Sequence, residues 1–342
     1  MITNPTVFVL GAGASFDFGL PLGPQLVTDI IALCRTRDDF LLNLLSPTGM
    51  QHKDLPDLAD TLERSGRPTI DEFLRLNPRF RNVGTRAIAI QLLQCEEETK
   101  LTRNAGEDNH YQHIINLMAS RTRNAQEFIN RNEVTFITFN YDRSFEQYLY
   151  TSVLQSYEEL DSESSRKITG LAPVLHVHGA LGDLPCRARI VPPTDTPLVI
   201  PYGNIRNRDP ELMNHETIGR IATNLRMIYD DGVDTSPTLT KAKKAICDAK
   251  QVVFLGFGYD RDNLIRLIPN LFTDPKDRYM DDIQAGRKYF GSAKYLGKQK
   301  EGELTEFFDK SGGAQDSGLG QIYLHDGDCL SSLQELQLRF ET

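Results

Sequence analysis

A set of short apolar runs, rich in β-branched and aromatic residues, limits the fold class of this 342-residue chain more than any other feature. Several of the runs are apolar at alternating positions on both sides, which is typical of strands buried on both faces of a parallel sheet. We therefore expect a buried parallel sheet. The expected strands cover residues 6–10, 134–139, 174–177, 189–191, 251–255, 288–292 and 321–324.

Helical periodicity fills the chain between these runs, most extensively between the first two. Amphipathic stretches occur at 25–33, 69–76, 86–94 and 218–228. Strands that alternate with helices predict an α/β fold. We expect residues 1–342 to form a single domain, a Rossmann-like doubly wound parallel sheet with a large helical insertion after the first strand. The insertion, about residues 22–130, is expected to cap the carboxyl ends of the strands, where such sheets bind ligands.

Composition argues against several classes of protein. The formal net charge is −9, from 38 basic and 47 acidic side chains, which argues against binding the phosphate backbone of nucleic acids. No run approaches the roughly 20 apolar residues that cross a bilayer, and the first residues lack the pattern of a signal peptide. The five cysteines form no C-x-x-C pair, which suits a reducing compartment and leaves no structural zinc site. We therefore expect a cytoplasmic protein without direct nucleic-acid or membrane binding.

A glycine-rich loop directly follows the first expected strand. Glycine lets the backbone turn sharply and approach a pyrophosphate, and the helix after the loop offers unpaired N–H groups to its negative charge. A plain tight turn is the alternative. A dehydrogenase is disfavoured because Phe16 stands where the third glycine of its fingerprint would fall. The candidate phosphate-binding residues are Gly11, Ala12, Gly13, Ala14 and Ser15, followed by Gly19 and Pro21.

An asparagine and an aspartate follow the end of the second expected strand, within T-F-N-Y-D at 138–142. The Asn140 side chain can donate and accept hydrogen bonds, which suits holding a ribose hydroxyl or a water molecule. Asp142 can fix the start of a helix before Ser144. A plain capping role is the alternative for this motif.

Two histidines lie at the end of the third expected strand, in L-H-V-H-G at 175–179. On a strand His176 and His178 share one face, and Gly179 lets the chain turn so that His178 can reach a ligand as a general base. A His-x-His metal pair is one alternative, although the sequence offers no convincing third ligand. A buried histidine with only a packing role is another, and it suits His176 better than His178.

A second glycine-rich turn follows the expected strand at 251–255. Gly256 and Gly258 stand in L-G-F-G-Y-D, and a helix is expected to start near Asp262. Glycine loops after two strands of one sheet suit the two halves of a dinucleotide, although either loop could be turn chemistry alone.

These four motifs, in this order, resemble the pattern of the sirtuin superfamily, and more closely the prokaryotic sirtuin-like NADases of antiphage defence. That pattern is G-A-G-x-S with G-I-P, then T-Q-N-x-D, then x-H-G, then a glycine loop after a strand, and the match spans residues 6 to about 329. The resemblance implies that the loop at 11–15 binds phosphate and that Asn140 and Asp142 line the ribose and nicotinamide pocket. It implies that His178 is the catalytic base.

The chain departs from protein-deacylating sirtuins at several points. L-G-P at 22–24 stands where those proteins have Asp-Phe-Arg, and Phe139 replaces the glutamine of T-Q-N. Their four-cysteine zinc module is missing, since only Cys186 and Cys247 lie in that interval. Binding of acyl-lysine peptides therefore loses support, while the part of the site that binds and activates NAD remains.

The resemblance implies an NAD glycohydrolase, which cleaves NAD⁺ to nicotinamide and ADP-ribose without a metal and acts as an NAD-depleting effector. The alternatives are a non-catalytic module that senses NAD or ADP-ribose, an ADP-ribosyl transferase and a deacylase. Because an unregulated NADase would drain its own cell, and no separate sensor domain is evident, we expect a homo-oligomer or control by a partner protein. The resemblance implies an ATPase or a nucleic-acid-sensing protein as that partner.

Overall fold

The structure of the protein is a computed structural model. It describes residues 1–46, 54–102, 109–158, 164, 173–186, 198–227, 230, 235–268, 287–294, 296–310 and 322–340. The strand expected at 189–191 lies outside the described residues.

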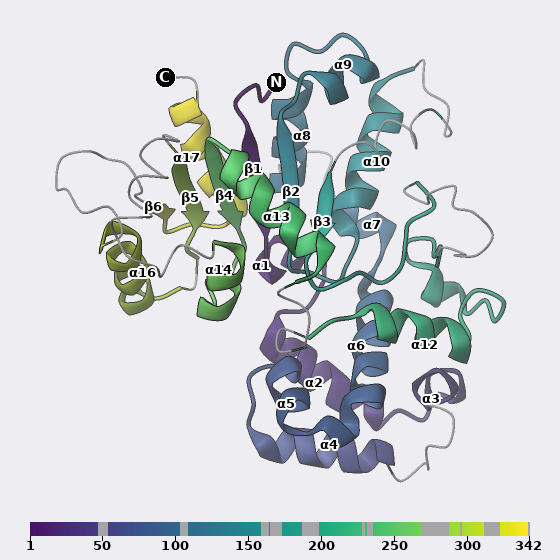
Figure 1. Cartoon of the computed structure of the whole chain (residues 1–342). Coiled ribbons are helices and arrows are strands. Elements are labelled where there is room, and N and C mark those ends of the chain that lie inside the picture. The colour runs from purple at the N-terminus through teal and green to yellow at the C-terminus, as the bar shows by residue number, and fades with distance from the viewer. Residues whose placement is uncertain are drawn as a thin grey trace.

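Six parallel strands form one sheet in the order β3-β2-β1-β4-β5-β6 (Figure 1). This order confirms the expected Rossmann-like arrangement, because successive strands are added to one side of β1 and then to the other. The strands are β1 (Thr6–Leu10), β2 (Val134–Thr138), β3 (Val174–His176), β4 (Gln251–Leu255), β5 (Lys288–Ser292) and β6 (Ile322–His325).

The central strand β1 pairs in step with both of its neighbours. Leu10, the last residue of β1, lies opposite Thr138 at the end of β2 and Leu255 at the end of β4. The three strands therefore end at the same level. The loops that follow them start side by side at one edge of the sheet, which is where the sequence motifs fall.

A helical segment separates β1 from β2, as expected. Its described helices are α1 (Ala12–Phe16), α2 (Gly23–Cys34), α3 (Asp39–Leu45), α4 (Asp54–Ser65), α5 (Ile70–Leu76), the 3₁₀ helix η1 (Pro78–Phe80), α6 (Arg81–Cys95), α7 (Glu98–Leu101), α8 (His110–Ala119) and α9 (Ala125–Asn130). The helices described after β2 are α10 (Ser144–Ser156), the 3₁₀ helix η2 (Asn204–Asn207), α12 (His215–Asn224), α13 (Pro237–Asp248), α14 (Arg261–Leu267), α16 (Lys298–Lys310) and α17 (Cys329–Phe340). None of these described helices is both long enough and apolar enough to span a membrane.

Side-chain caps fix where several helices begin. At the start of α5 the Thr69 hydroxyl accepts a hydrogen bond from the N–H of Glu72, which is the arrangement of residues found in a capping box. The side chains of Asn109 and Asp260 cap α8 and α14 in the same manner. The cap explains why α5 begins one residue into the stretch that periodicity predicts.

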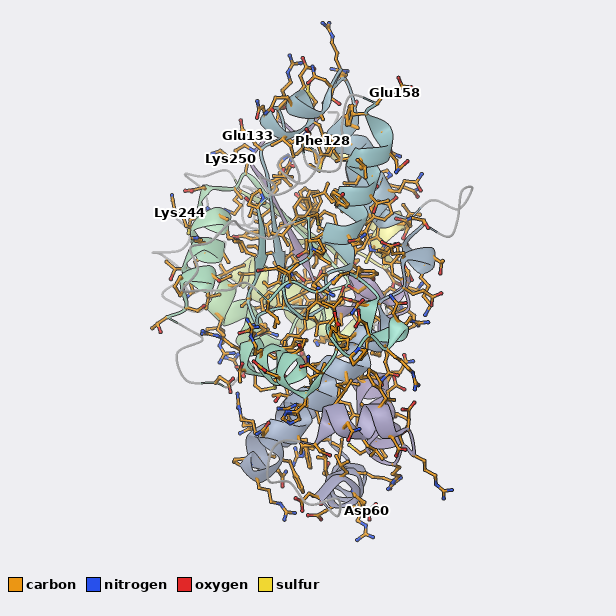
Figure 2. The ribbon with its side chains drawn as sticks, turned by 90° about the vertical axis from the view of Figure 1, so that its right-hand side faces the viewer. Asp60, Phe128, Glu133, Glu158, Lys244 and Lys250 are labelled. Atoms are coloured by element: carbon orange, nitrogen blue, oxygen red, sulfur yellow. The ribbon has the colours of Figure 1, made fainter. Side chains whose placement is uncertain are left out.

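The helical segment occupies two places in the molecule (Figure 1). Helices α2, α4, α5 and α6 form a lobe beyond the carboxyl ends of the strands, whereas α8 and α9 run back beside the sheet toward the start of β2. Figure 2 places Asp60 of α4 at one end of the molecule and Glu133 and Lys250, which precede β2 and β4, toward the other. The return is required because β2 is parallel to β1 and must start at the opposite edge. Only the first part of the segment therefore lies beyond the ligand edge.

The two faces of the sheet carry separate apolar cores. Phe8 and Leu10 of β1 belong to the core that includes the helical segment, α10 and α17, whereas Val7 and Val9 belong to the core beneath α13 and α14. Successive side chains of a strand point to opposite faces, so a strand between two cores must be apolar throughout. This is why the expected strands could be recognised as continuous apolar runs.

A buried ion pair joins the helical segment to the rest of the fold near the sheet edge. Arg143, which precedes α10, donates through Nε to Glu96 Oε1 at 3.0 Å and through Nη2 to Oε2 at 2.5 Å. Its third nitrogen donates to the main-chain oxygen of Ile200 at 2.6 Å. The two side chains are only 1% and 0% exposed. The three elements that carry these residues are held together by charge-assisted hydrogen bonds away from water.

Removing the charge of Glu96 should strongly destabilise the protein. Replacing Glu96 with glutamine leaves Arg143 buried without a counter-charge, and we expect the free energy of unfolding to fall by about 3–5 kcal/mol. The matched control is Asp60→Asn, because Asp60 pairs with Arg35 where both side chains are about half exposed, and its loss should cost less than about 1 kcal/mol. Urea unfolding followed by circular dichroism measures both. Equal losses would show that the buried pair is unimportant.

Candidate active site

The glycines of the first and fourth motifs pack against each other. The N–H of Gly11 donates to the Leu255 carbonyl at 3.0 Å, and the N–H of Gly13 donates to the Gly256 carbonyl at 2.9 Å. A Cβ at Gly11 would lie 2.5 Å from the Gly256 oxygen, and one at Gly256, whose φ is +56°, would lie 2.0 Å from the Ala14 nitrogen. Both positions therefore require glycine. We call this contact between the loops after β1 and β4 the glycine-loop contact.

The contact changes the expected role of the loop at 11–15. Its N–H groups were expected to face a pyrophosphate, but those of Gly11 and Gly13 donate to the β4 loop and that of Ala14 donates to the Gly11 carbonyl at 2.9 Å. These three N–H groups are therefore used within the protein. Gly19, with φ of +88°, and Pro21 lie just beyond, in the turn between α1 and α2. The loop joins two strand ends and directs the Gly11 carbonyl toward the second motif.

Asn140 spans the gap between the first and second motifs. Its Nδ2 donates to the Gly11 carbonyl at 2.9 Å and to the Ser15 hydroxyl at 3.0 Å. Because a carbonyl only accepts hydrogen bonds, this contact fixes the orientation of the amide. The Oδ1 atom has no partner among the described residues. Asn140 therefore offers a ligand an acceptor and not a donor.

Asp142 fixes the turn that leads into α10 and is not itself the N-cap, which is Arg143. Its carboxylate accepts a hydrogen bond from the N–H of Ser144 at 3.0 Å, and α10 begins there. The side chain is buried, and burial raises the pKa of Asp142 although hydrogen bonds from Ser144 and Ser15 oppose the change. Asp142 is therefore a buried group that lines the small cavity beside Asn140.

The two histidines of the third motif do not share a face, contrary to expectation. Strand β3 ends at His176, and the chain turns at the next residues. His176 bonds to the Asn140 carbonyl at 3.0 Å and to Glu146 of α10 at 2.6 Å, whereas the ring of His178 lies against Phe139, with centroids 5.4 Å apart. The two rings therefore do not form a His-x-His pair. Among the described residues no group of three or more His, Cys, Asp or Glu side chains is placed to hold a metal.

His178 is a buried histidine whose ring nitrogens make no hydrogen bonds within the described part of the chain. It is 3% exposed. Burial lowers the pKa of His178 to about 4, and Arg266 also lowers it. The nearby Asn263 side chain raises the pKa of His178, but it forms no hydrogen bond with the ring in this geometry. At neutral pH the ring is therefore uncharged.

Sequence reasoning missed two contacts at this edge. Glu146 lies on the first turn of α10, six residues after Asn140, and it holds His176. The hydroxyl of Tyr141 lies 3.2 Å from Asp71 of α5 and 3.0 Å from the Arg226 carbonyl. The second contact joins the helical segment directly to the second motif. The contact of Glu146 with His176 had a signal in the sequence, because a helix was expected to start directly after the motif. The sequence gives no signal for the contact of Tyr141 with Asp71.

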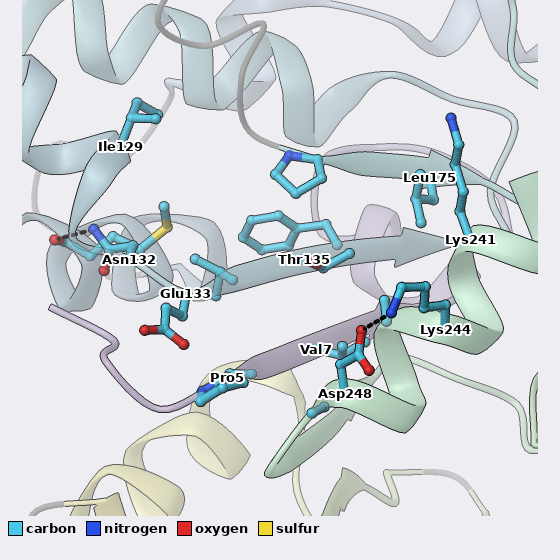
Figure 3. A pocket seen from close by; sticks show the side chains of 17 residues that line it. Pro5, Val7, Ile129, Asn132, Glu133, Thr135, Leu175, Lys241, Lys244 and Asp248 are labelled. Carbon is cyan, nitrogen blue, oxygen red and sulfur yellow. Dashed lines mark hydrogen bonds and ion pairs between the residues drawn. The ribbon is translucent and has the colours of Figure 1, made fainter.

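The described residues form a small cavity at the carboxyl edge of the sheet and a larger hollow at its amino edge. A cavity of about 10 Å³, large enough for about one water molecule, is lined on its polar side by Ser15, Tyr111, Thr138, Asn140, Asp142 and Glu146. Figure 3 shows a larger hollow of about 540 Å³ at the amino edge, between the start of β2 and α13.

We place the candidate site at the carboxyl edge, although the hollow there is the smaller one. The larger hollow brings together Glu133, Lys241 and the ion pair of Lys244 with Asp248 at 2.8 Å, so its charges are mixed and partly paired. The carboxyl edge instead carries a free amide oxygen and a buried neutral histidine on neighbouring strand ends.

No protein-family model matches this chain, and no curated protein sequence matches it. The fold and the site define a Rossmann-like α/β protein with a polar centre at the carboxyl ends of β1, β2 and β3.

The glycine-loop contact can be tested with a pair of alanine substitutions. At Gly256 an added Cβ meets backbone atoms at a positive φ, so Gly256→Ala should destabilise the protein by about 3 kcal/mol or more. At Gly258 no atom lies within 4 Å of an added Cβ, and Gly258→Ala should change stability by less than about 0.5 kcal/mol. Urea unfolding compares them. Similar stabilities would mean that the two loops do not pack as described.

The pKa of His178 predicts a component of the pH dependence of stability. Its value is about 4 in the folded protein against 6.5 ordinarily, so between these values the unfolded chain binds a proton that the folded protein does not. Stability is therefore lost as the pH falls through this window, by about 2 kcal/mol from about pH 7.5 to about pH 5. Urea unfolding of wild type and His178→Gln at both pH values isolates the component. An identical pH dependence in the two proteins would contradict it.

Proposed function

We propose that this protein is an NAD glycohydrolase, which cleaves NAD⁺ to nicotinamide and ADP-ribose. The observation that carries the proposal is the pair of free acceptors at neighbouring strand ends, Oδ1 of Asn140 after β2 and the uncharged ring of His178 after β3. The order of the motifs, which resembles that of sirtuin-like NADases, supports the same activity.

The chemistry of the bond suits these two groups. Loss of nicotinamide leaves positive charge on the ribose, as in the oxocarbenium-like transition states of glycoside hydrolysis. An amide oxygen can orient a ribose hydroxyl or the attacking water, and a neutral imidazole can take the proton that this group releases. Because His178 is uncharged, it does not repel the cationic ribose. The ring of Phe139 lies against His178, and Phe257 packs in turn on Phe139, so the imidazole is shielded from bulk water.

We place the dinucleotide across the carboxyl ends of β1 and β4. The strand order reverses there, and ligands of doubly wound sheets bind at such a switch point. The glycine-loop contact holds the ends of β1 and β4 close together at this point, which fixes the backbone that would face the substrate. No metal is assigned a role, since the proposed steps need only a proton acceptor and an oriented nucleophile.

We further propose that the helical segment controls the activity through self-assembly or a partner protein, as in antiphage defence. The supporting observation is the contact of Tyr141 with Asp71, because it ties α5 to the loop that carries Asn140. A movement of α5 would therefore reach the site through one side chain. An ATPase or a nucleic-acid-sensing protein is the kind of partner that the resemblance suggests.

The activity is tested by incubating the purified full-length protein with NAD⁺ and measuring nicotinamide and ADP-ribose, with and without a chelator. We expect turnover in both conditions. His178→Ala should lower kcat by about 10²-fold or more, and Asn140→Ala should lower kcat far more than it raises KM. His113→Gln, on α8, is the matched control and should keep full activity.

The outcomes separate the candidate functions. Turnover that His178→Ala does not reduce would show that the assigned base is wrong. Binding of NAD⁺ or ADP-ribose in a thermal-shift assay without product, at every protein concentration tested, would identify a non-catalytic binding module. Transfer of ADP-ribose to an acceptor peptide would identify a transferase.

A further inference from the structure

Two side chains hold the main chain of Asn140. Its N–H donates to the Thr138 hydroxyl at 3.0 Å, and its carbonyl accepts from Nδ1 of His176 at 3.0 Å. Within the described part of the chain neither group bonds to another backbone group, because β2 ends at Thr138. The backbone position from which the Asn140 carboxamide reaches Gly11 and Ser15 therefore depends on a hydroxyl and an imidazole.

His176 is fixed in turn by Glu146. Its Nε2 lies 2.6 Å from Glu146 Oε1, and the two side chains are 13% and 6% exposed. The Asn140 carbonyl can only accept, so Nδ1 of His176 must carry a hydrogen. A charged Glu146 then makes Nε2 a second donor. His176 is then the donor in both hydrogen bonds, to the Asn140 carbonyl and to the Glu146 carboxylate.

The electrostatics agree with this assignment. Burial lowers the pKa of His176, but the charge and hydrogen bond of Glu146 outweigh it, so the pKa lies above its ordinary value. The Asn140 carbonyl and the nearby Asp142 act in the same direction. The protonated form of His176 is therefore favoured by its place between a carbonyl and a carboxylate, whereas burial disfavours the protonated form of His178.

We propose that His176 and Glu146 are positioning residues for Asn140: they hold its main-chain carbonyl so that its carboxamide reaches Gly11 and its Oδ1 is presented to the ligand. The pair does not touch the reacting atoms. The catalytic consequence rests on the proposed function, whereas the orientation of the carboxamide is a property of the protein alone.

Two isosteric replacements of His176 separate positioning from packing. The amide nitrogen of asparagine can occupy the place of Nδ1, and that of glutamine the place of Nε2. Both are made in a Glu146→Gln background, so that no buried carboxylate is left unpaired. Glu146→Gln/His176→Asn keeps a donor to the Asn140 carbonyl, and Glu146→Gln/His176→Gln loses it.

The first readout is the side-chain amide signal of Asn140 in ¹⁵N-asparagine-labelled full-length protein, assigned by its loss in Asn140→Asp. The signal should keep its chemical shifts and its protection from solvent exchange in the variant with asparagine at 176. It should shift and lose protection in the variant with glutamine. The same behaviour in both double variants would overturn the proposal, whether or not the protein cleaves NAD⁺.

The second readout is steady-state cleavage of NAD⁺. The glutamine variant should have a kcat lower than that of the asparagine variant by between about tenfold and a hundredfold, with similar KM and similar unfolding midpoints. Equal kcat values in an active protein would overturn the proposal. A wild type that gives no product at any protein concentration, with or without an added partner protein, but shows the expected amide signals would overturn the proposed function and leave the positioning established.

Discussion

The arrangement of the site depends on the glycine-loop contact. The parallel strands β1 and β4 end at the same level, so the loops that follow them lie side by side. Backbone hydrogen bonds from Gly11 and Gly13 join these two loops. Once the Gly11 carbonyl is fixed, Asn140 has an acceptor to reach, and its own carbonyl meets His176. The position of the free Asn140 oxygen therefore depends on close packing that only glycine allows at Gly11 and Gly256.

The sheet could be predicted from the sequence because burial on both faces makes the central strands β1 and β4 nearly continuous apolar runs. Thr6–Leu10, Gln251–Leu255 and Lys288–Ser292 have the predicted limits, whereas β3 stops one residue early because the chain turns at Val177. Helix limits were less well predicted, since they depend on caps such as Thr69 and not on periodicity.

The site was predicted at the level of its residues but not of their directions. Placing Asn140 and His178 at strand ends required only the motif positions, and both lie there. The different surroundings of His176 and His178 were not predictable, because a turn that starts one residue earlier reverses which core a side chain faces. The pairing of Glu146 with His176, and of Asp71 with Tyr141, joins residues from different elements. Such pairs follow from the packing of helices, which a single sequence does not encode in any local pattern.

The position of β1 at the centre of the sheet has a consequence for synthesis. Its two partners are made much later, since β2 begins at Val134 and β4 at Gln251. At a translation rate of roughly 5–20 residues per second, β1 waits on the order of ten seconds to a minute for its second neighbour. Contacts this distant along the chain slow folding. During that interval the helical segment, whose contacts are closer in sequence, can complete its own core beside β1 and keep this apolar strand from other nascent chains.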